Sequence, residues 1–246
     1  MTMTPKHTFT FRAYQQDIDC TNRMSLASVV RALLNAACMA ADDNRFGTIQ
    51  LNQNGLTWVL SRLSLKIDRL PESEHNFQIS TWIEACNNIV STRNFLITDE
   101  SGVELGSACS MWSIIDLNTR QPINLMTQNY LLEAVQGDKV SCPRPRHIAL
   151  PAEPDSCMEH KVVYSDLDFN RHVNSTRYID WMMNALPISV VEANEIAGCT
   201  INYSAESHFG ENVVVVQKTE ESSSSCGIKR DEKPVCTMKI DWKIKN

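Results

Sequence analysis

Residues 165–186 read SDLDFNRHVNSTRYIDWMMNAL, and this stretch decides how the rest of the chain is interpreted. It carries an acid, an amide and an imidazole at alternate positions, namely Asp168, Asn170 and His172. In an extended segment, residues two apart point to the same side, so the alternation predicts three polar groups facing one cavity. A helical pattern of apolar residues follows and ends before Pro187. The three groups are therefore expected beside a helix N-terminus, where the dipole favours developing negative charge.

The same residue types also form ordinary helix caps and turns. Asp, Asn and Ser before a helix accept hydrogen bonds from its first N–H groups, and Asn174 or Ser175 can fill that role alone. Capping explains any one of these residues well. It does not explain an acid, an amide and a histidine together, so we interpret the three as a candidate catalytic group.

This stretch also resembles a known family. The pattern Asp166-Leu-Asp168-Phe-Asn170-Arg-His172-Val-Asn174, followed by Tyr178-Ile179 and Trp181, is similar to the signature of the acyl-acyl-carrier-protein thioesterases, the plant and bacterial enzymes that end fatty-acid elongation. Residues 202–206, Asn-Tyr-Ser-Ala-Glu, resemble that family's Glu-Tyr-Arg-Arg-Glu. Four upstream stretches extend the likeness over nearly the whole chain: Trp58 to Arg62, Asp68 to Pro71, Thr81-Trp82 and Ser110 to Trp112.

The resemblance implies a fold, an activity and a partner. The fold is α+β, a tandem hotdog in which each unit wraps a long helix in an antiparallel sheet. The activity is hydrolysis of the thioester of fatty acyl-acyl carrier protein, which releases free fatty acid, and the partner is the acyl carrier protein. The resemblance adds Glu206 as a fourth catalytic candidate, which would bind and activate water together with His172.

The order of predicted elements supports a repeated plan. A strand at 7–14 precedes a helix at 25–45, and strands follow at 55–69, 77–85, 91–98 and 103–116. A second strand at 158–164 precedes a helix at 174–186, and strands follow at 198–208, 212–220 and on both sides of 231–233. We therefore expect an N-terminal unit at 1–138, a proline-rich linker at 139–157 and a C-terminal unit at 158–246.

We hypothesise an internal duplication in which the second half carries the chemistry. A shift of 149 residues superposes Asp19 on Asp168 but sets Thr21 and Arg23 against the amide and the imidazole. A shift of about 139 sets Ile67 against Glu206. The first unit is therefore expected to be non-catalytic and to supply an acyl pocket, with these residues as candidates: Leu33, Cys38, Met39, Trp58 and Trp82.

The composition of the chain limits the classes of function that it can have. The chain has 246 residues, 43% of them hydrophobic, and a net charge of −6, which disfavours nucleic-acid binding. An acidic carrier would need a local basic patch, and the candidates are Lys139 with residues 143–147, or Lys161 with Arg171 and Arg177. No apolar run approaches the roughly 20 residues of a membrane span, and no secretory signal is recognised, so a bacterial cytoplasmic location is expected.

Cysteine usage points to a reducing compartment. The nine cysteines include no CxxC pair and no Cys/His metal spacing, so we expect reduced thiols and neither a metal nor a cofactor.

The proposed chemistry is direct attack by water on the thioester. The imidazole of His172 can accept the proton. Asn170 and the backbone N–H groups at the helix start can stabilise the oxyanion, and Asp168 can orient either neighbour. A covalent route would need a nucleophile beside the histidine, but Cys199 lies too far along the strand and Ser207 is a weak candidate.

Three rival functions remain open from the sequence. An acyl-CoA thioesterase would use the same chemistry on an acyl chain carried by coenzyme A. A hotdog dehydratase would transfer protons along a carbon chain, and a non-catalytic acyl-binding protein would carry out no reaction. The acyl chain preference and the oligomeric state, monomer or homodimer, are also left open.

Overall fold

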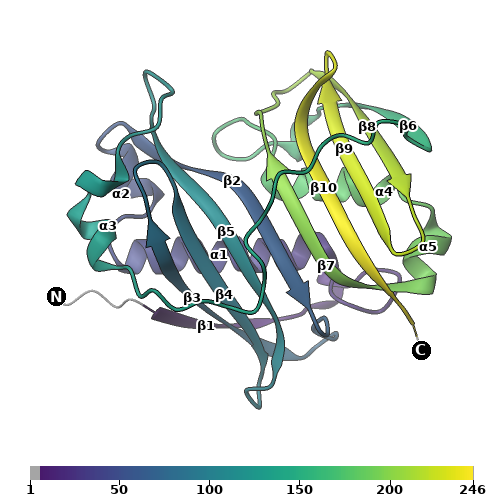
Figure 1. The fold of residues 1–246 in the computed structure, drawn as a ribbon, viewed down its shortest axis with the longest axis horizontal. Coiled ribbons are helices and arrows are strands. Elements are labelled where there is room, and N and C mark those ends of the chain that lie inside the picture. Colours follow the sequence, from purple (N-terminus) through teal and green to yellow (C-terminus); the bar gives the residue numbers. More distant parts are fainter. Residues whose placement is uncertain (1–5, 246) are drawn as a thin grey trace.

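The computed structural model describes residues 6–245 and contains one ten-stranded antiparallel sheet with the strand order β1-β3-β4-β5-β2-β7-β10-β9-β8-β6 (Figure 1). The first five strands in this order come from the first half of the sequence and the last five from the second half. Each half places its long helix before most of its strands. The predicted α+β class, with a helix and an antiparallel sheet in each half, is confirmed.

The first half contains five strands and its long helix. The bounds of the strands and longer helices are β1 Lys6–Arg12, α1 Leu26–Asp43, α2 Thr48–Asn52, β2 Leu56–Ile67, β3 Asn76–Cys86, β4 Ser91–Asp99, β5 Glu104–Asp116 and α3 Asn129–Glu133. A hairpin joins β4 to β5, with Gly102 at a φ of +87° in its turn. Every strand predicted in this half is found within a few residues of its expected bounds.

The second half repeats the order with a shorter helix. Its elements are β6 Ser156–Lys161, α4 Ser175–Asn184, α5 Ile188–Ala193, β7 Asn194–Tyr203, β8 Asn212–Thr219, β9 Ser223–Arg230 and β10 Lys233–Ile244. The main difference from expectation is at β7, which ends at Tyr203 instead of continuing to residue 208.

The two halves meet through the central pair of strands. Residues 62–66 of β2 pair antiparallel with residues 198–202 of β7. Leu63 lies opposite Ile201 in this register, and both side chains are fully buried. The sheet is therefore continuous across the middle of the molecule, and its hydrophobic core includes residues from both halves.

Helices α1 and α4 lie together on one face of the sheet (Figure 1). Helix α1 begins after Ser25, whose side chain accepts a hydrogen bond from Ser28 N–H. Its buried face is rich in alanine, including Ala32, Ala36 and Ala40. Small side chains allow a helix to approach its neighbours closely, which explains how α1 packs under the sheet and beside α4.

The linker crosses the opposite face of the sheet (Figure 1) and is held by side chains of the central strands. Asn202 is buried and bonds twice: its Nδ2 donates to Arg146 O at 2.9 Å, and its Oδ1 accepts from Ile148 N–H at 2.6 Å. Thr237 Oγ1 donates to Ile148 O at 2.9 Å. Gly227 leaves room for Leu150, whose Cδ2 would lie 2.3 Å from an added Cβ. The linker is thus fixed against the sheet along much of its length.

Replacing Asn202 by alanine should release the linker. Arg146 O and Ile148 N–H would lose their buried partner, so we expect a loss of about 1–3 kcal/mol in the free energy of unfolding. Urea denaturation measures this loss, and limited proteolysis should cut faster within residues 139–157. Asn118→Ala, in an exposed loop, should change stability by less than about 0.5 kcal/mol. Equal stability of the two variants would contradict this explanation.

Candidate functional site

The segment that carries Asp168, Asn170 and His172 is a tight turn and not the extended segment predicted from the sequence. Asp168 N–H donates to His172 O at 2.8 Å, and Arg171 N–H donates to Asp168 O at 3.0 Å. Arg171 has a φ of +64°, which lies in the left-handed region that residues of tight turns adopt. The extended geometry predicted for these residues is therefore wrong.

Asp168 organises this turn through its carboxylate. Its Oδ1 accepts hydrogen bonds from Asn170 N–H at 2.8 Å and from His172 N–H at 3.2 Å. Asp168 thus bonds to the backbone of both neighbours, while no hydrogen bond joins its carboxylate to the His172 ring within residues 6–245. The helix cap is supplied instead by Asn174, whose side chain accepts from Thr176 N–H at 3.0 Å.

Glu206 reaches His172 from a loop and not from a strand as predicted. Residues 204–207 follow the end of β7, and Ser207 O accepts a hydrogen bond from Val173 N–H at 2.9 Å. An isolated antiparallel bridge also pairs His172 with His208. These backbone contacts hold the two segments together and place Glu206 Oε1 3.4 Å from His172 Nδ1.

Arg120 is a site residue that sequence analysis missed. Its Nη2 lies 2.6 Å from both carboxylate oxygens of Glu206, although the two residues are 86 positions apart. Arg120 belongs to the first half, in the loop that follows β5, and has a φ of +58°. No motif or periodicity marks this residue, because its role depends only on how the halves are joined.

A cavity of about 320 Å³ opens beside the turn. Asp168 and Asn170 line it from the second half, and α1, β2, β4 and β5 line it from the first. Of the expected pocket residues, Cys38 and Trp58 line this cavity. Leu33 and Trp82 are buried away from it and Met39 is 43% exposed, so these three residues do not line this cavity.

Arg93 gives the cavity a buried positive charge. It lines the cavity and is 7% exposed, and its Nη1 donates to Thr81 Oγ1 at 3.3 Å. No carboxylate lies within ion-pair distance of it in the described part of the chain. Burial lowers the pKa of the guanidinium to about 10, so it stays protonated at neutral pH.

The first half builds the same turn without the same chemistry. Asp19 N–H donates to Arg23 O at 2.9 Å, and Asp19 Oδ1 accepts from Thr21 N–H at 2.8 Å, as Asp168 does with His172 and Asn170. Asn22 has a φ of +60°, matching Arg171. The shift of 149 residues therefore holds in three dimensions.

The counterpart of Glu206 is Leu70 and not Ile67. Asp68 and Arg69 N–H groups both donate to Leu105 O at 3.0 Å, as Ser204 and Ala205 N–H groups both donate to Val235 O at 2.8 and 3.1 Å. Continuing this register by one residue pairs Leu70 with Glu206, a shift of 136.

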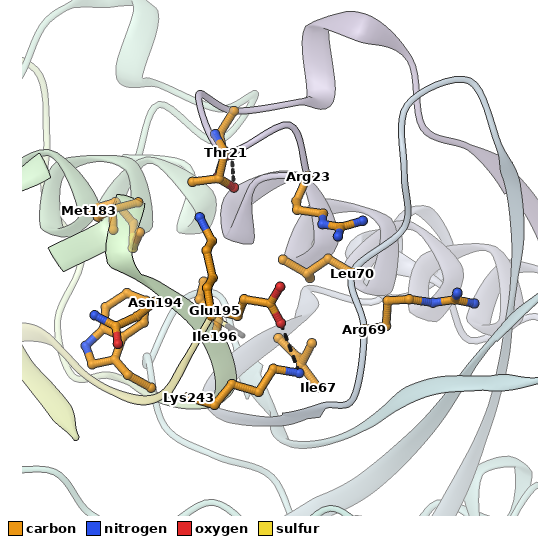
Figure 2. A pocket seen from close by; sticks show the side chains of 14 residues that line it. Thr21, Arg23, Ile67, Arg69, Leu70, Met183, Asn194, Glu195, Ile196 and Lys243 are labelled. Carbon is orange, nitrogen blue, oxygen red and sulfur yellow. Dashed lines mark hydrogen bonds and ion pairs between the residues drawn. The ribbon is translucent and has the colours of Figure 1, made fainter. Parts of the chain in front are cut away.

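Figure 2 shows the pocket beside the first-half turn, where Thr21, Arg23 and Leu70 surround the space. The ion pair of Lys243 with Glu195 lies at its edge, with 3.2 Å between the charged atoms. The pocket measures about 40 Å³, against about 320 Å³ beside the second turn. Among residues 6–245, the first-half turn thus has no counterpart of the His172 imidazole or the Glu206 carboxylate, and the pocket beside it is much smaller than the cavity beside the second turn.

The two nucleophile candidates are both inaccessible. Ser207 is fully buried, and its Oγ has no hydrogen-bond partner by distance and angle, although it faces the Tyr178 hydroxyl. Cys199 is 2% exposed, and burial raises the pKa of its thiol well above its ordinary value. This arrangement disfavours a covalent route through either residue.

Family models match both halves of the chain. The model described as the acyl-ACP thioesterase N-terminal domain matches residues 4–131, and the one described as the acyl-ACP thioesterase C-terminal domain matches residues 151–243. An acyl-ACP thioesterase structure from Bacteroides thetaiotaomicron is 30% identical with a TM-score of 0.87, and the likeness covers 97% of this chain and 98% of that one.

Plant relatives are more distant. The oleoyl-acyl carrier protein thioesterase 2 of Arabidopsis thaliana is 26% identical over 82% of this chain, which spans 59% of that enzyme's length. The 12:0-ACP thioesterase of Umbellularia californica shares the fold, with a TM-score of 0.88 at 21% identity over 98% of each chain. Among the helices of residues 6–245, none has both the length and the hydropathy needed to cross a membrane.

Replacing Asp168 by alanine should disturb the turn and with it the position of His172. The Asn170 and His172 N–H groups would lose their acceptor, so we expect the free energy of unfolding to fall by about 0.5–2 kcal/mol. The turnover rate should also fall, because the backbone that carries His172 would shift. Asp168→Asn keeps an oxygen acceptor and should retain more of both properties. Urea denaturation and turnover assays measure the two effects.

Asp19 provides the matched control for this prediction. Asp19→Ala removes the equivalent acceptor from the first-half turn, so it should cost a similar free energy of unfolding and leave activity unchanged. If both alanine variants lost activity equally, the second turn would have no special role.

Proposed function

Because this chain belongs to the acyl-ACP thioesterase family, we propose that it hydrolyses the thioester of fatty acyl-acyl carrier protein and releases free fatty acid. The observation that supports this best is the approach of Glu206 Oε1 to within 3.4 Å of His172 Nδ1 next to a turn that lines a cavity of about 320 Å³. A base and a carboxylate thus lie beside a turn that lines a cavity, and the equivalent turn of the first half has neither side chain.

The proposed reaction begins with a water molecule beside His172 and Glu206. These groups accept its proton as its oxygen attacks the thioester carbonyl carbon. The carbonyl oxygen becomes an oxyanion, which the Asn170 amide and the positive end of the α4 dipole stabilise. The carbon–sulfur bond then breaks, the carrier thiolate takes up a proton, and the acid leaves.

Two further residues support this proposal. The Asn170 side chain forms no hydrogen bond within the described part of the chain and lines the cavity, so its amide is available to a substrate carbonyl. Arg120 acts as a positioning residue, because its contact with both oxygens of Glu206 fixes that carboxylate beside the imidazole.

Two exposed cations of the second half are candidates for contact with an acidic carrier. Of the residues proposed from the sequence, Arg144 is already paired with Glu84, and Arg177 contacts Ser165 O and Asp180. Lys161 and Arg171 are exposed and have no acidic partner within ion-pair distance among residues 6–245. We propose that these two cations contact the carrier.

We propose that the protein resides in a reducing compartment such as the bacterial cytoplasm. All nine cysteines are free thiols, which fits such a compartment.

Replacing His172 or Glu206 by alanine should remove most of the activity. Each change deletes a group that handles the proton of the attacking water, so we expect the rate of thiol release from acyl-acyl carrier protein to fall by at least about 100-fold. The assay follows free thiol with acyl-carrier and acyl-CoA substrates of several chain lengths.

Arg23→Ala is the matched control, since Arg23 occupies the position of His172 in the first half. It should retain the activity of the unaltered protein. A preference for acyl-CoA would change the proposed substrate, and binding of acyl chains without thiol release would refute hydrolysis.

Filling the cavity should shift the chain-length preference. Cys38 lines the cavity from α1, and Cys38→Phe would occupy part of the space available to an acyl chain. We expect the ratio of kcat/KM for long over short acyl-carrier substrates to decrease. Cys157→Phe, at an exposed position of β6, should leave this ratio unchanged. An unchanged ratio in Cys38→Phe would place the acyl chain elsewhere.

A further inference from the structure

His208 adds a third metal-binding type of side chain to the candidate site. Its ring lies 4.9 Å from that of His172 between centroids, with the planes at 81°. The antiparallel backbone bridge between His172 and His208 holds the two residues next to each other. One donor atom from each of His172, Glu206 and His208 lies within 4.8 Å of the other two.

The chemistry of this donor set points to one class of ion. Two imidazoles with one carboxylate bind Zn²⁺ in sites that keep a further position open. Zinc ligands lie about 2.0–2.2 Å from the ion, so the donor atoms of a tetrahedral site lie about 3.3 Å from each other. The three side chains are 26%, 38% and 53% exposed, which leaves them free to close the remaining distance by side-chain rotation.

We propose that His172, Glu206 and His208 bind a Zn²⁺ ion reversibly and that the bound ion stops hydrolysis. The ion would occupy an imidazole nitrogen and a carboxylate oxygen that the reaction requires. The inhibition rests on the proposed function, whereas the binding does not.

Arg120 competes with the ion for the same carboxylate. Its Nη2 lies 2.6 Å from both oxygens of Glu206, so a metal ion at this site must displace the guanidinium. Arg120 is 46% exposed and lies in a loop, where the side chain can move aside. This competition predicts opposite effects for two substitutions, because removing a ligand weakens binding and removing the competitor strengthens it.

The test is titration of the full chain, first treated with chelator, with Zn²⁺ by calorimetry and with Co²⁺ by absorption spectroscopy. We expect the unaltered protein to bind one ion. His208→Gln should weaken binding by at least about 10-fold, and Arg120→Gln should tighten it. In the thiol-release assay, His208→Gln should keep the metal-free rate and need at least about 10-fold more Zn²⁺ for half inhibition.

Two results would overturn the site. One is equal affinity of the unaltered protein and His208→Gln, provided that both unfold at the same urea concentration. The other is a thiolate-to-cobalt charge-transfer band, which would place the ion on a cysteine such as Cys20 or Cys157. Because calorimetry needs no turnover, metal binding is decided even if the chain does not hydrolyse acyl-acyl carrier protein.

Discussion

The pairing of β2 with β7 is the interaction on which the rest of the structure depends. It joins two half-sheets into one ten-stranded sheet and fixes how each half faces the other. The cavity and the contact between Arg120 and Glu206 both arise across this junction. The cavity has one wall from the turn before α4 and the others from the first half, and Arg120 reaches Glu206 from the first half. Neither half alone contains a complete candidate site.

The two halves share a backbone plan but not a chemistry. The turns at 19–23 and 168–172 use matching hydrogen bonds, and the segments after β2 and β7 do the same. At equivalent positions, one half has Thr21, Arg23 and Leu70 and the other has Asn170, His172 and Glu206. The backbone framework therefore accommodates either set, and these three side chains are what distinguishes the two halves at the equivalent positions.

The sequence predicted the elements well because they rest on local patterns. The helical spacing of apolar residues in α1 and α4 and the strand-turn-strand pattern of 91–116 depend on neighbours along the chain. Contacts between segments far apart in the chain could not be predicted in the same way. The alternation of Asp168, Asn170 and His172 suggested a shared face, yet a hydrogen bond from Asp168 N–H to His172 O folds the segment into a turn. The approach of Arg120 to Glu206 spans 86 positions and leaves no periodic signal.

The most direct test of the account is a single-turnover experiment with acyl-acyl carrier protein and excess protein, quenched at short times. Carrier thiol, free fatty acid and the intact mass of the chain are measured in the same samples. The account predicts that thiol and fatty acid appear at the same rate while the mass of the chain stays unchanged, as water attack requires. Thiol release ahead of fatty acid, with an acyl group attached to the chain, would contradict it.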